Sequence, residues 1–382
     1  MKLLDGILVV DFSQFLSGPS ASLRLADFGA RVIKIEKPGT GDICRQLYVS
    51  EFEVANESTL FHAINRNKES FSVNLKDEKD KELVKALVKK ADVMMHNFRP
   101  GVMEKLGFSY KEIQNINPKI IYAGISGYGE EGEWKDLPGQ DLLLQSLSGL
   151  AYLNAESTKI PTPMGISVVD ILAGTHLAQG ILAALVKRDN SGLGSLVQVS
   201  MLESALDFQF EVFTNFLNDG EELPERSEQN HAHSYVAAPY GVYKTLDGYL
   251  ALAMGSIPIL AQLLNCAALT KYDNPKNWFR QRDEIKEILA DHLKNQNTKY
   301  WLDILEPADI WCAKVLTIEE LSAEEGYKVL EMEMKVRTSK GQVIKTTRCP
   351  VRINGEILRS EKAAPFLGEH NDAIVNEFGL MK

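Results

Sequence analysis

The feature that most constrains the fold is a regular alternation of short apolar runs with helical stretches over the first 200 residues. Strand-like runs occupy residues 7–10, 31–36, 70–75, 93–97, 119–126 and 196–200. Between them, Pro19 opens a helical pattern that runs to Gly29, and residues 77–90 have the periodicity of an amphipathic helix. Strands that alternate with helices form βαβ units, so the sequence predicts a parallel sheet of the α/β class.

The second half of the chain is patterned differently. Helices are expected at 141–150 and 171–187, and the latter is apolar on nearly every face, which predicts a buried helix. A Leu246-Asp247-Gly248 turn joins two short strands into a hairpin, helical patterns follow at 283–293 and 299–305, and Trp278, Trp301 and Trp311 lie among apolar residues as expected for a core. We therefore predict a large α/β domain that begins with residues 1–217, a polar linker at 218–234, a small α+β domain at 235–328, and a return segment at 329–382 that completes the large domain.

Charge and cysteine usage exclude several kinds of partner. The 382 residues carry a net charge of −10, which argues against nucleic acid and anionic membrane surfaces as partners. The four cysteines are far apart in the sequence and show neither zinc-site nor disulfide spacing. The most apolar run, 168–186, contains Asp170, His176 and Gln179, which is atypical of a membrane span. We expect a cytoplasmic protein with no export segment.

Two cofactor sites are disfavoured by the motifs. Glu36 ends the second strand, where an acid could bind a ribose, but the turn after the first strand lacks G-x-G-x-x-G and contains Pro19, so NAD binding is not expected. His231-Ala232-His233 lies in the polar stretch without a carboxylate or cysteine at ligand spacing, so no metal site is expected.

Asp170 is the most informative acid, because it directly precedes the apolar helix expected from Ile171. It could be a structural N-cap, which is a common role for aspartate. It could instead be a carboxylate nucleophile, kept ionised by the positive end of the helix and close to N–H groups that stabilise an oxyanion. His176, on the same helix, is better explained as a hydrogen-bonded core histidine.

Basic residues are concentrated in the first third of this acidic chain. Several follow predicted strands, at the edge where open α/β sheets bind ligands. They fit a phosphate-bearing ligand and a solvated basic face equally well. The residues are Lys37, Arg45, Arg66, Lys68, Lys76, Arg99 and Lys105.

Several segments together resemble the class III coenzyme A transferases, the family that contains formyl-CoA transferase, carnitine CoA transferase and α-methylacyl-CoA racemase. They cover nearly the whole chain. The segments are VVDFSQFLSGPSASLRLADFGARVIKIEKPGTGD from Val9, NRNKES from Asn65, ADVMMHNFRPGVMEKLG from Ala91, GISGYGEEG from Gly124, DLLLQSLSGL from Asp141, VVDILAGTHLAQGILAAL from Val168, AAPYGVYKTLDGY from Ala237 and PFLGEHND near the C-terminus.

The resemblance implies a Rossmann-like large domain, a smaller α+β domain and an interlocked homodimer. It makes Asp170 the nucleophile that accepts CoA as an aspartyl-CoA thioester, with acyl-CoA and a carboxylic acid as substrates and no permanently bound cofactor or metal. It also implies a set of CoA-binding residues and, around the acid, a substrate pocket. The CoA set is Ser17, Lys37, Lys76, Asn97, Phe98, Arg99 and Lys105, and the pocket set is Leu16, Gln140 and Asp141.

Departures from the family pattern narrow the activity. Family transferases often have Gln where Leu16 stands and Tyr where Gln140 stands, and the glycine-rich flap of formyl-CoA transferase is absent around Gly255. The racemases have His and Glu where this chain has Gln140 and Ile257, and neither of these can carry a proton at neutral pH. We therefore expect a CoA-transferase, with an acyl-CoA racemase, a non-catalytic CoA-binding protein and an NAD oxidoreductase as alternatives.

Overall fold

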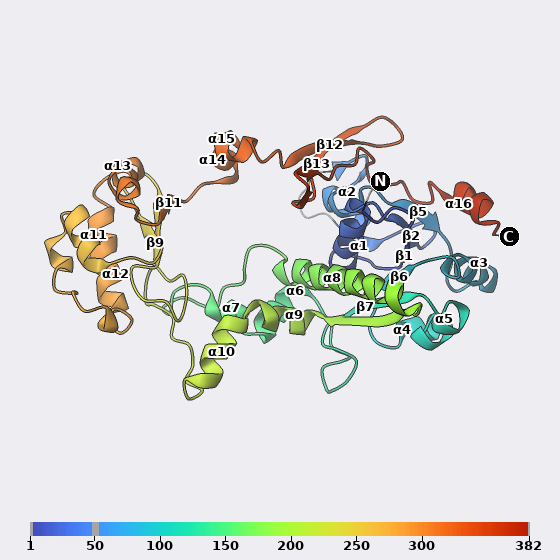
Figure 1. Ribbon diagram of the computed structural model, residues 1–382, viewed down its shortest axis with the longest axis horizontal. Helices are drawn as coiled ribbons and strands as arrows, with labels where there is room; N and C mark the ends of the chain where they lie inside the picture. Colours follow the sequence, from blue (N-terminus) through green and yellow to red (C-terminus); the bar gives the residue numbers. More distant parts are fainter. Residues whose placement is uncertain (1–2, 48–52, 381–382) are drawn as a thin grey trace. The chain divides into compact units, whose positions relative to one another are not determined.

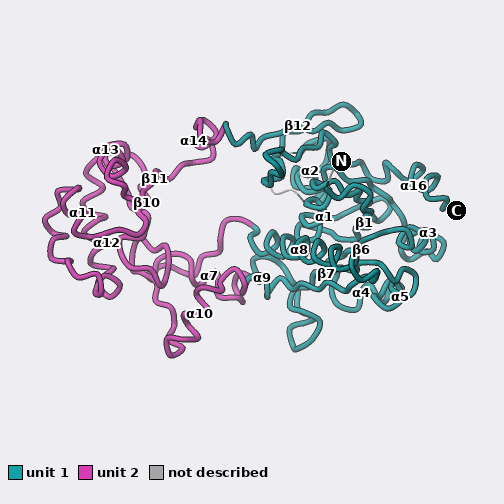
Figure 2. The backbone as a smooth tube through the Cα atoms, in the orientation of Figure 1, with its two compact units in different colours: residues 1–144, 167–205, 329–382 teal, residues 145–166, 206–328 magenta. Residues whose placement is uncertain are grey.

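The structure is a computed structural model that describes residues 3–47 and 53–380. It contains two compact units, each formed by separate segments of the chain (Figure 2). Unit 1 contains Met1–Leu144, Ser167–Ala205 and Val329–Lys382, and unit 2 contains residues 145–166 and 206–328.

Unit 1 is built on a parallel sheet of six strands in the order β5-β2-β1-β6-β7-β8 (Figure 1). The strands are β1 (Leu8–Asp11), β2 (Arg31–Glu36), β5 (Glu69–Ser72), β6 (Val93–His96), β7 (Ile121–Ser126) and β8 (Ser195–Ser200). Each neighbouring pair is parallel, which confirms the predicted α/β sheet. The strand order changes direction between β1 and β6, and ligands of such open sheets bind outside the carboxyl ends of the strands at this point.

Helices cover both faces of this sheet because the side chains of each strand alternate between the two faces. On one face α1 (Ser17–Asp27) packs beside α8 (Val168–Ser191) (Figure 1). On the other face, Val10, Ile33 and Met94 share an apolar core with the helices that follow the strands. These helices are α3 (Glu78–Val88), α4 (Val102–Leu106), α5 (Tyr110–Ile116) and the C-terminal α16 (Asn371–Phe378).

The C-terminal segment of unit 1 lies against the edge strand of the sheet. The Asn371 side chain accepts a hydrogen bond from Ser72 N at 2.8 Å and donates to Ser72 O at 3.0 Å. The remaining elements of unit 1 are short. They are β3 (Glu53–Val54), β4 (Glu57–Ser58), α2 (Thr59–Asn65), β12 (Glu333–Arg337), β13 (Val343–Thr347), β14 (Arg352–Ile353) and β15 (Glu356–Ile357), while α6 (Asp141–Leu147) and α9 (Met201–Phe208) continue into unit 2.

Unit 2 has a three-stranded antiparallel sheet, β11-β10-β9, that shares an apolar core with helices. The hairpin of β9 (Gly241–Lys244) and β10 (Tyr249–Leu252) is confirmed, as are α12 (Arg282–Leu293) and α13 (Thr298–Leu305). Trp301 is buried, but the core position expected for Trp311 is wrong: it is 60% exposed, because it precedes the edge strand β11. The other elements are α7 (Leu150–Leu153), α10 (Phe210–Asn218), α11 (Ile257–Leu263), β11 (Cys312–Lys314), α14 (Ile318–Ala323) and α15 (Glu325–Lys328).

The division of the chain differs from the expected boundaries at two segments. Residues 145–166 belong to unit 2, and the polar stretch 218–234 is part of that unit rather than a free linker. Hydrogen bonds join the two stretches: Ser157 N donates to Ser227 O at 2.9 Å, and Arg226 donates to Asn154 O at 3.1 Å. The polar residues that predicted a linker therefore hold two distant segments together.

Helix α8 is less enclosed than its sequence predicts. Its buried residues include Ala173, Leu177 and Ile181, but Ile171 and Val186 are 46% and 65% exposed. By length and composition α8 is the one helix among the described residues that could cross a membrane. Half of its most apolar stretch is buried, and it packs on α1, β7 and β8 as a core helix does.

Candidate active site

Asp170 lies in the first turn of α8, as its third residue. The expected N-cap role is wrong, because the helix begins at Val168 rather than at Ile171. The carboxylate of Asp141 caps the helix from α6 instead: its Oδ2 accepts hydrogen bonds from Val169 N at 2.8 Å and Asp170 N at 3.1 Å. Asp170 is thus left with its side chain available for another role.

A close approach of two helices brings Ser17 to Asp170. Gly174 lies one helical turn after Asp170, and a Cβ there would be 2.1 Å from Ser20 Oγ and 2.5 Å from Ser17 O. Only glycine permits this contact. Ser17 is the first residue of α1, so its N–H has no partner within that helix. The backbone and the hydroxyl of Ser17 face the Asp170 carboxylate closely enough to lower its pKa.

The environment of Asp170 raises its pKa to about 6. Burial is the largest cause, the negative charge of Asp141 adds to it, and the hydrogen bonds from Ser17 oppose both. Asp141 occupies two N–H groups of the helix terminus, so this terminus does not lower the pKa of Asp170 below its usual value. With a pKa of about 6, roughly nine-tenths of Asp170 is still ionised at pH 7.

Asn97 holds the loop that leads to Ser17. It follows β6, and its side-chain amide spans the gap to the loop after β1. Its Oδ1 accepts from Gln14 N at 2.8 Å, while its Nδ2 donates to Gln14 O at 2.7 Å and to Ser17 Oγ at 3.2 Å. Because Ser17 Oγ accepts from Asn97, its own proton is free to point to Asp170. The Asn97 contacts lie at the change in strand order between β1 and β6.

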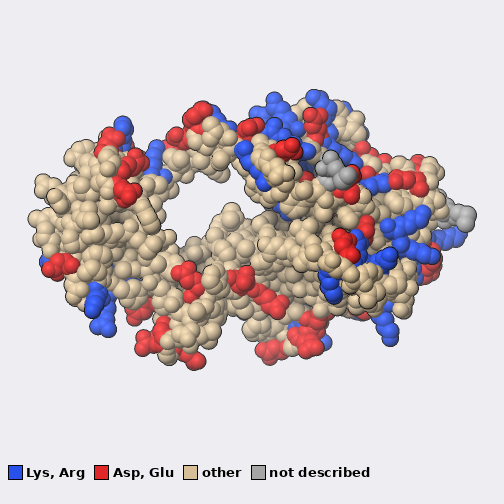
Figure 3. Space-filling view, in the orientation of Figure 1, with Lys and Arg blue, Asp and Glu red and all other residues tan. Residues whose placement is uncertain are grey.

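The basic residues separate into two groups. Lys37, Lys76, Arg99 and Lys105 are exposed, and the first three follow β2, β5 and β6 at the carboxyl edge of the sheet. Arg45, Arg66 and Lys68 are almost fully buried and bound to carboxylates, so they are unavailable to a ligand. The partners of Arg66 and Lys68 come from distant segments, which local sequence could not reveal, whereas Arg45 pairs with the nearby Glu36. More Lys and Arg side chains lie on unit 1 than on unit 2 in the face shown by Figure 3.

The expected pocket residues are not equivalent. Leu16 is the half-buried residue before α1, and Gln140 is exposed before α6. Asp141 is 92% buried and bonded to the first turn of α8, so its position is that of a helix cap. Phe98 is half-buried beside His96, with 6.3 Å between the ring centroids. Within residues 3–47 and 53–380, no three His, Cys, Asp or Glu side chains come together as a metal site.

Sequence reasoning missed Gly174 and the clamp that Asn97 forms on Gln14. A glycine four residues after Asp170, inside an otherwise apolar helix, was a usable signal for a close helix contact. No local pattern in the sequence indicates the Asn97 clamp, because its partners Gln14 and Ser17 are 83 and 80 residues away.

Known proteins match this architecture over its whole length. The family model "CoA-transferase family III" matches residues 4–371. This chain belongs to CoA-transferase family III. It is a CoA-transferase, and the family moves CoA between carboxylic acids.

The similar proteins differ in their acids. The chain is 31% identical to a succinyl-CoA:glutarate CoA-transferase from Mus musculus, covering 99% of this chain and 86% of that protein. It is 33% identical to an acetyl-CoA:oxalate CoA-transferase from Acetobacter aceti, covering 98% and 95%. The crystal structure of a CAIB/BAIF family protein from Brucella suis superposes with a TM-score of 0.85 at 27% identity, covering 99% of both chains.

Proposed function

We propose that this chain is an acyl-CoA:carboxylate CoA-transferase in which Asp170 is the covalent CoA carrier. The observation that carries the proposal is the placement of Asp170. Asp170 lies in the first turn of α8, and the backbone and hydroxyl of Ser17 face its carboxylate and oppose the rise in its pKa. A carboxylate with a pKa of about 6 is a better nucleophile than an ordinary aspartate and is still mostly ionised at neutral pH.

The chemistry proceeds through two anhydrides. The Asp170 carboxylate attacks the donor thioester carbonyl and expels CoA thiolate, which leaves an aspartyl–acyl anhydride. The thiolate attacks the Asp170 carbonyl carbon, forms the aspartyl-CoA thioester and releases the donor acid. The acceptor carboxylate then attacks this thioester and expels the thiolate again, and the thiolate attacks the acceptor acyl carbon, which releases the new acyl-CoA and free Asp170. Ser17 N–H and hydroxyl donate to the oxygens on which negative charge develops.

CoA is proposed to bind along the carboxyl edge of strands β5, β2, β1 and β6. Exposed cations follow these strands at Lys37, Lys76 and Arg99, and Lys105 follows in α4. Cations and backbone N–H groups at such an edge suit the phosphates of a nucleotide. Ser17 and Asn97 lie at the same edge and bring the reactive end of CoA to Asp170. Phe98 offers an aromatic surface beside them.

A racemase is less well supported. Racemisation needs two groups that exchange protons with opposite faces of the α-carbon. Ile257 is fully buried in the core of unit 2, and Gln140 has no proton to exchange at neutral pH. His176, six residues after Asp170, has its Nδ1 3.0 Å from Ser204 Oγ. A non-catalytic CoA-binding protein would not need a buried carboxylate beside Ser17.

A homodimer and a cytoplasmic location complete the proposal. Large apolar side chains are exposed in the single chain, on α8 at Ile171 and Val186 and on α10 at Phe210 and Leu217. A second copy of the chain would bury them. All four cysteines are free thiols, as in proteins of reducing compartments.

The experiment is a substrate panel. Succinyl-CoA and acetyl-CoA are offered as donors to mono- and dicarboxylic acids, and the mass of each new thioester is read. At least one acid should gain CoA with the wild-type chain and none with Asp170→Ala. Transfer by Asp170→Ala above one hundredth of the wild-type rate would overturn the assignment of Asp170.

A further inference from the structure

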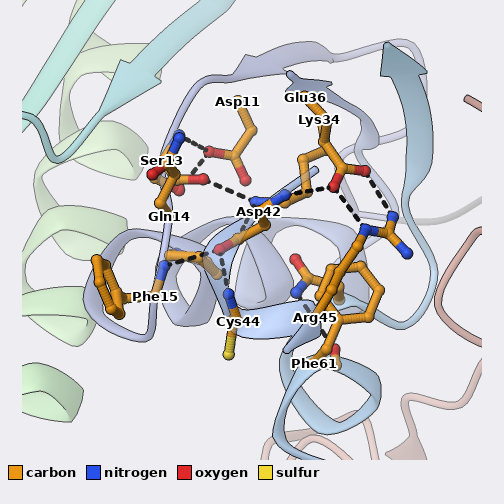
Figure 4. Close-up of polar contacts among 12 residues, drawn as sticks. Asp11, Ser13, Gln14, Phe15, Lys34, Glu36, Asp42, Cys44, Arg45 and Phe61 are labelled. Atoms are coloured by element: carbon orange, nitrogen blue, oxygen red, sulfur yellow. Dashed lines mark hydrogen bonds and ion pairs between the residues drawn. The ribbon is translucent and has the colours of Figure 1, made fainter. Parts of the chain in front are cut away.

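Six ionisable side chains are buried together around the ends of β1 and β2 and the residue before β5, and Figure 4 labels all of them except Lys68. None is more than 4% exposed. The carboxylates are Asp11, Glu36 and Asp42, and the cations are Lys34, Arg45 and Lys68. Three acidic and three basic side chains are therefore buried together. Buried ion pairs contribute little net stability because desolvation offsets their attraction, so a cluster of this kind calls for another explanation.

Lys34 is the centre of this cluster, which we call the buried charge cluster. It lies beside Asp11 in the register of β1 and β2. Its Nζ forms an ion pair with Asp42 Oδ2 at 2.8 Å and donates to Ser13 O at 2.7 Å. Asp42, in the loop after β2, uses its other oxygen for Phe15 N at 3.2 Å and Cys44 N at 2.9 Å. The Lys34–Asp42 pair thus contacts two residues of the loop after β1.

This loop has a conformation that its own sequence does not favour. Phe15 has φ of 60°, in the left-handed region that glycine tolerates and bulky residues avoid. The Phe15 side chain is 46% exposed, so apolar burial does not explain the conformation. The hydrogen bond from Phe15 N to Asp42 does, together with the Asn97 clamp on Gln14. Asp11 supports the same loop, since its Oδ1 accepts from Ser13 N at 2.8 Å.

The loop ends two residues later at Ser17, which contacts Asp170. A change at Ser13 or Phe15 therefore moves the first turn of α1, where Ser17 presents its N–H and hydroxyl. Gly18, next to Ser17, is packed on Ser13: a Cβ at Gly18 would be 2.2 Å from Ser13 Cβ. The buried charge cluster is therefore connected to Ser17 in two ways: through the loop that ends at Ser17 and through the packing of Gly18 on Ser13.

We propose that the Lys34–Asp42 ion pair is a positioning unit for catalysis, which holds the Ser13–Phe15 loop so that Ser17 stays aimed at Asp170. This inference rests on the proposed function of Asp170. Both members are positioning residues, because neither reaches the reacting atoms. The groups that face Asp170 are Ser17 from α1 and the charged Asp141 from α6, and those that face Lys34 are Asp11, Glu36, Asp42 and Lys68.

The test uses Asp42→Asn, which keeps the shape of the side chain and removes the ion pair. The readout is the pH dependence of kcat/KM, whose acid limb reports the ionisation of Asp170 in the free enzyme. Ser17→Ala should move this limb to higher pH by about 0.5–1 unit, because a hydrogen bond that favours the carboxylate is lost. Asp42→Asn should move it in the same direction, and the double variant should move it by less than the sum of the two single shifts, because both changes act through Ser17.

The matched control is Asp27→Asn. Asp27 ends α1 at the opposite end from Ser17, and its side chain forms a similarly buried ion pair with Arg66. Both Asp→Asn variants should lower the unfolding temperature, but Asp27→Asn should leave the acid limb at the wild-type pH. An equal limb shift in Asp27→Asn, no shift in Asp42→Asn, or additive shifts in the double variant would overturn the positioning role.

A second variant covers the case in which Asp42→Asn does not fold. Phe15→Val leaves the ion pair intact but puts a β-branched residue at a φ that it avoids, so it should displace the loop and move the acid limb upward, whereas Phe15→Gly, which tolerates this φ, should leave the limb at the wild-type pH. An unmoved limb in Phe15→Val would contradict the proposal. Failure of the proposed function itself has another signature, since Asp170→Ala would then retain transfer activity.

Discussion

Replacing Asp170 by Asn should stabilise the protein while it abolishes CoA transfer. The raised pKa of Asp170 means that the folded chain holds an ionised carboxylate at a cost, imposed first by burial and then by Asp141. Asn has the same shape, can still accept the hydrogen bonds from Ser17, and carries no charge. Active sites often exchange stability for reactivity in this way.

The magnitude follows from the two pKa values. The pKa of Asp170 is about 6 in the folded chain against an ordinary value of 3.8, and each pKa unit corresponds to about 1.4 kcal/mol. Because the folded pKa is raised, the protonated acid favours folding, and this advantage is lost as the pH rises from about 4 through 6. At pH 7.5 the charged form therefore costs up to about 3 kcal/mol, and at pH 4.5 about 1 kcal/mol. The gain in Asp170→Asn should be larger at pH 7.5 by about 1–2 kcal/mol, after a discount for solvent screening.

The assay is urea unfolding of both proteins at the two pH values, with Asp5→Asn as the matched control. Asp5 is an exposed acid of the same unit, so its replacement should change the free energy of unfolding by less than about 0.5 kcal/mol at either pH. An Asp170→Asn protein that is less stable than wild type at pH 7.5, or whose gain is equal at pH 4.5 and 7.5, would refute this description of the site.

Four further predictions test other parts of the site. Gly174→Ala should push α1 away from α8, which should lower the free energy of unfolding by about 1–3 kcal/mol and the rate of CoA transfer at least tenfold. In the control variant Gly165→Ala, the new Cβ has no atom within 4 Å, so neither quantity should change. Lys37→Ala should raise KM for acyl-CoA several-fold with kcat nearly unchanged, and the same change in an exposed lysine at the far end of α3, Lys89, should not. Transfer should decline as the pH falls through about 6, because protonated Asp170 cannot attack, and a flat profile from pH 5 to 8 would exclude it as the nucleophile. A 2-methylacyl-CoA kept in deuterated buffer should gain no α-deuterium beyond the enzyme-free control, and Asp170-dependent gain would instead indicate a racemase.

Most of the large unit could be predicted because its signals are local. Strands β1, β6 and β7 contain short apolar runs, and strand β2 has the predicted bounds of 31–36. The unit boundaries could not be predicted, because residues 145–166 join unit 2 through hydrogen bonds to residues about 70 positions away. Helix α8 was expected to be enclosed, and a sequence does not show which apolar faces a single chain leaves exposed.

The candidate site could be predicted only in part, because several of its contacts join residues that are far apart in the sequence. Residue patterns alone favoured a cap at Asp170, and the true cap, Asp141, is 29 residues away. The resemblance to a family, rather than periodicity or spacing, selected Asp170 as the nucleophile. The sequence predicts that Lys68 and Arg66 are exposed or bind a ligand. Both are instead buried, in ion pairs with Asp11 and Asp27. A charged residue with a distant partner cannot be told from a solvated one without the fold.

The most direct test of the central claim is the mass of the Asp170 peptide during turnover. The enzyme is mixed with the donor acyl-CoA that the substrate panel identifies, quenched in acid, digested and analysed by mass spectrometry. We predict that the peptide containing Asp170 gains the mass of CoA less one water, and that hydroxylamine converts this adduct to a hydroxamate at Asp170. An adduct on any other residue, or turnover of this donor with no adduct at all, would contradict covalent transfer through Asp170.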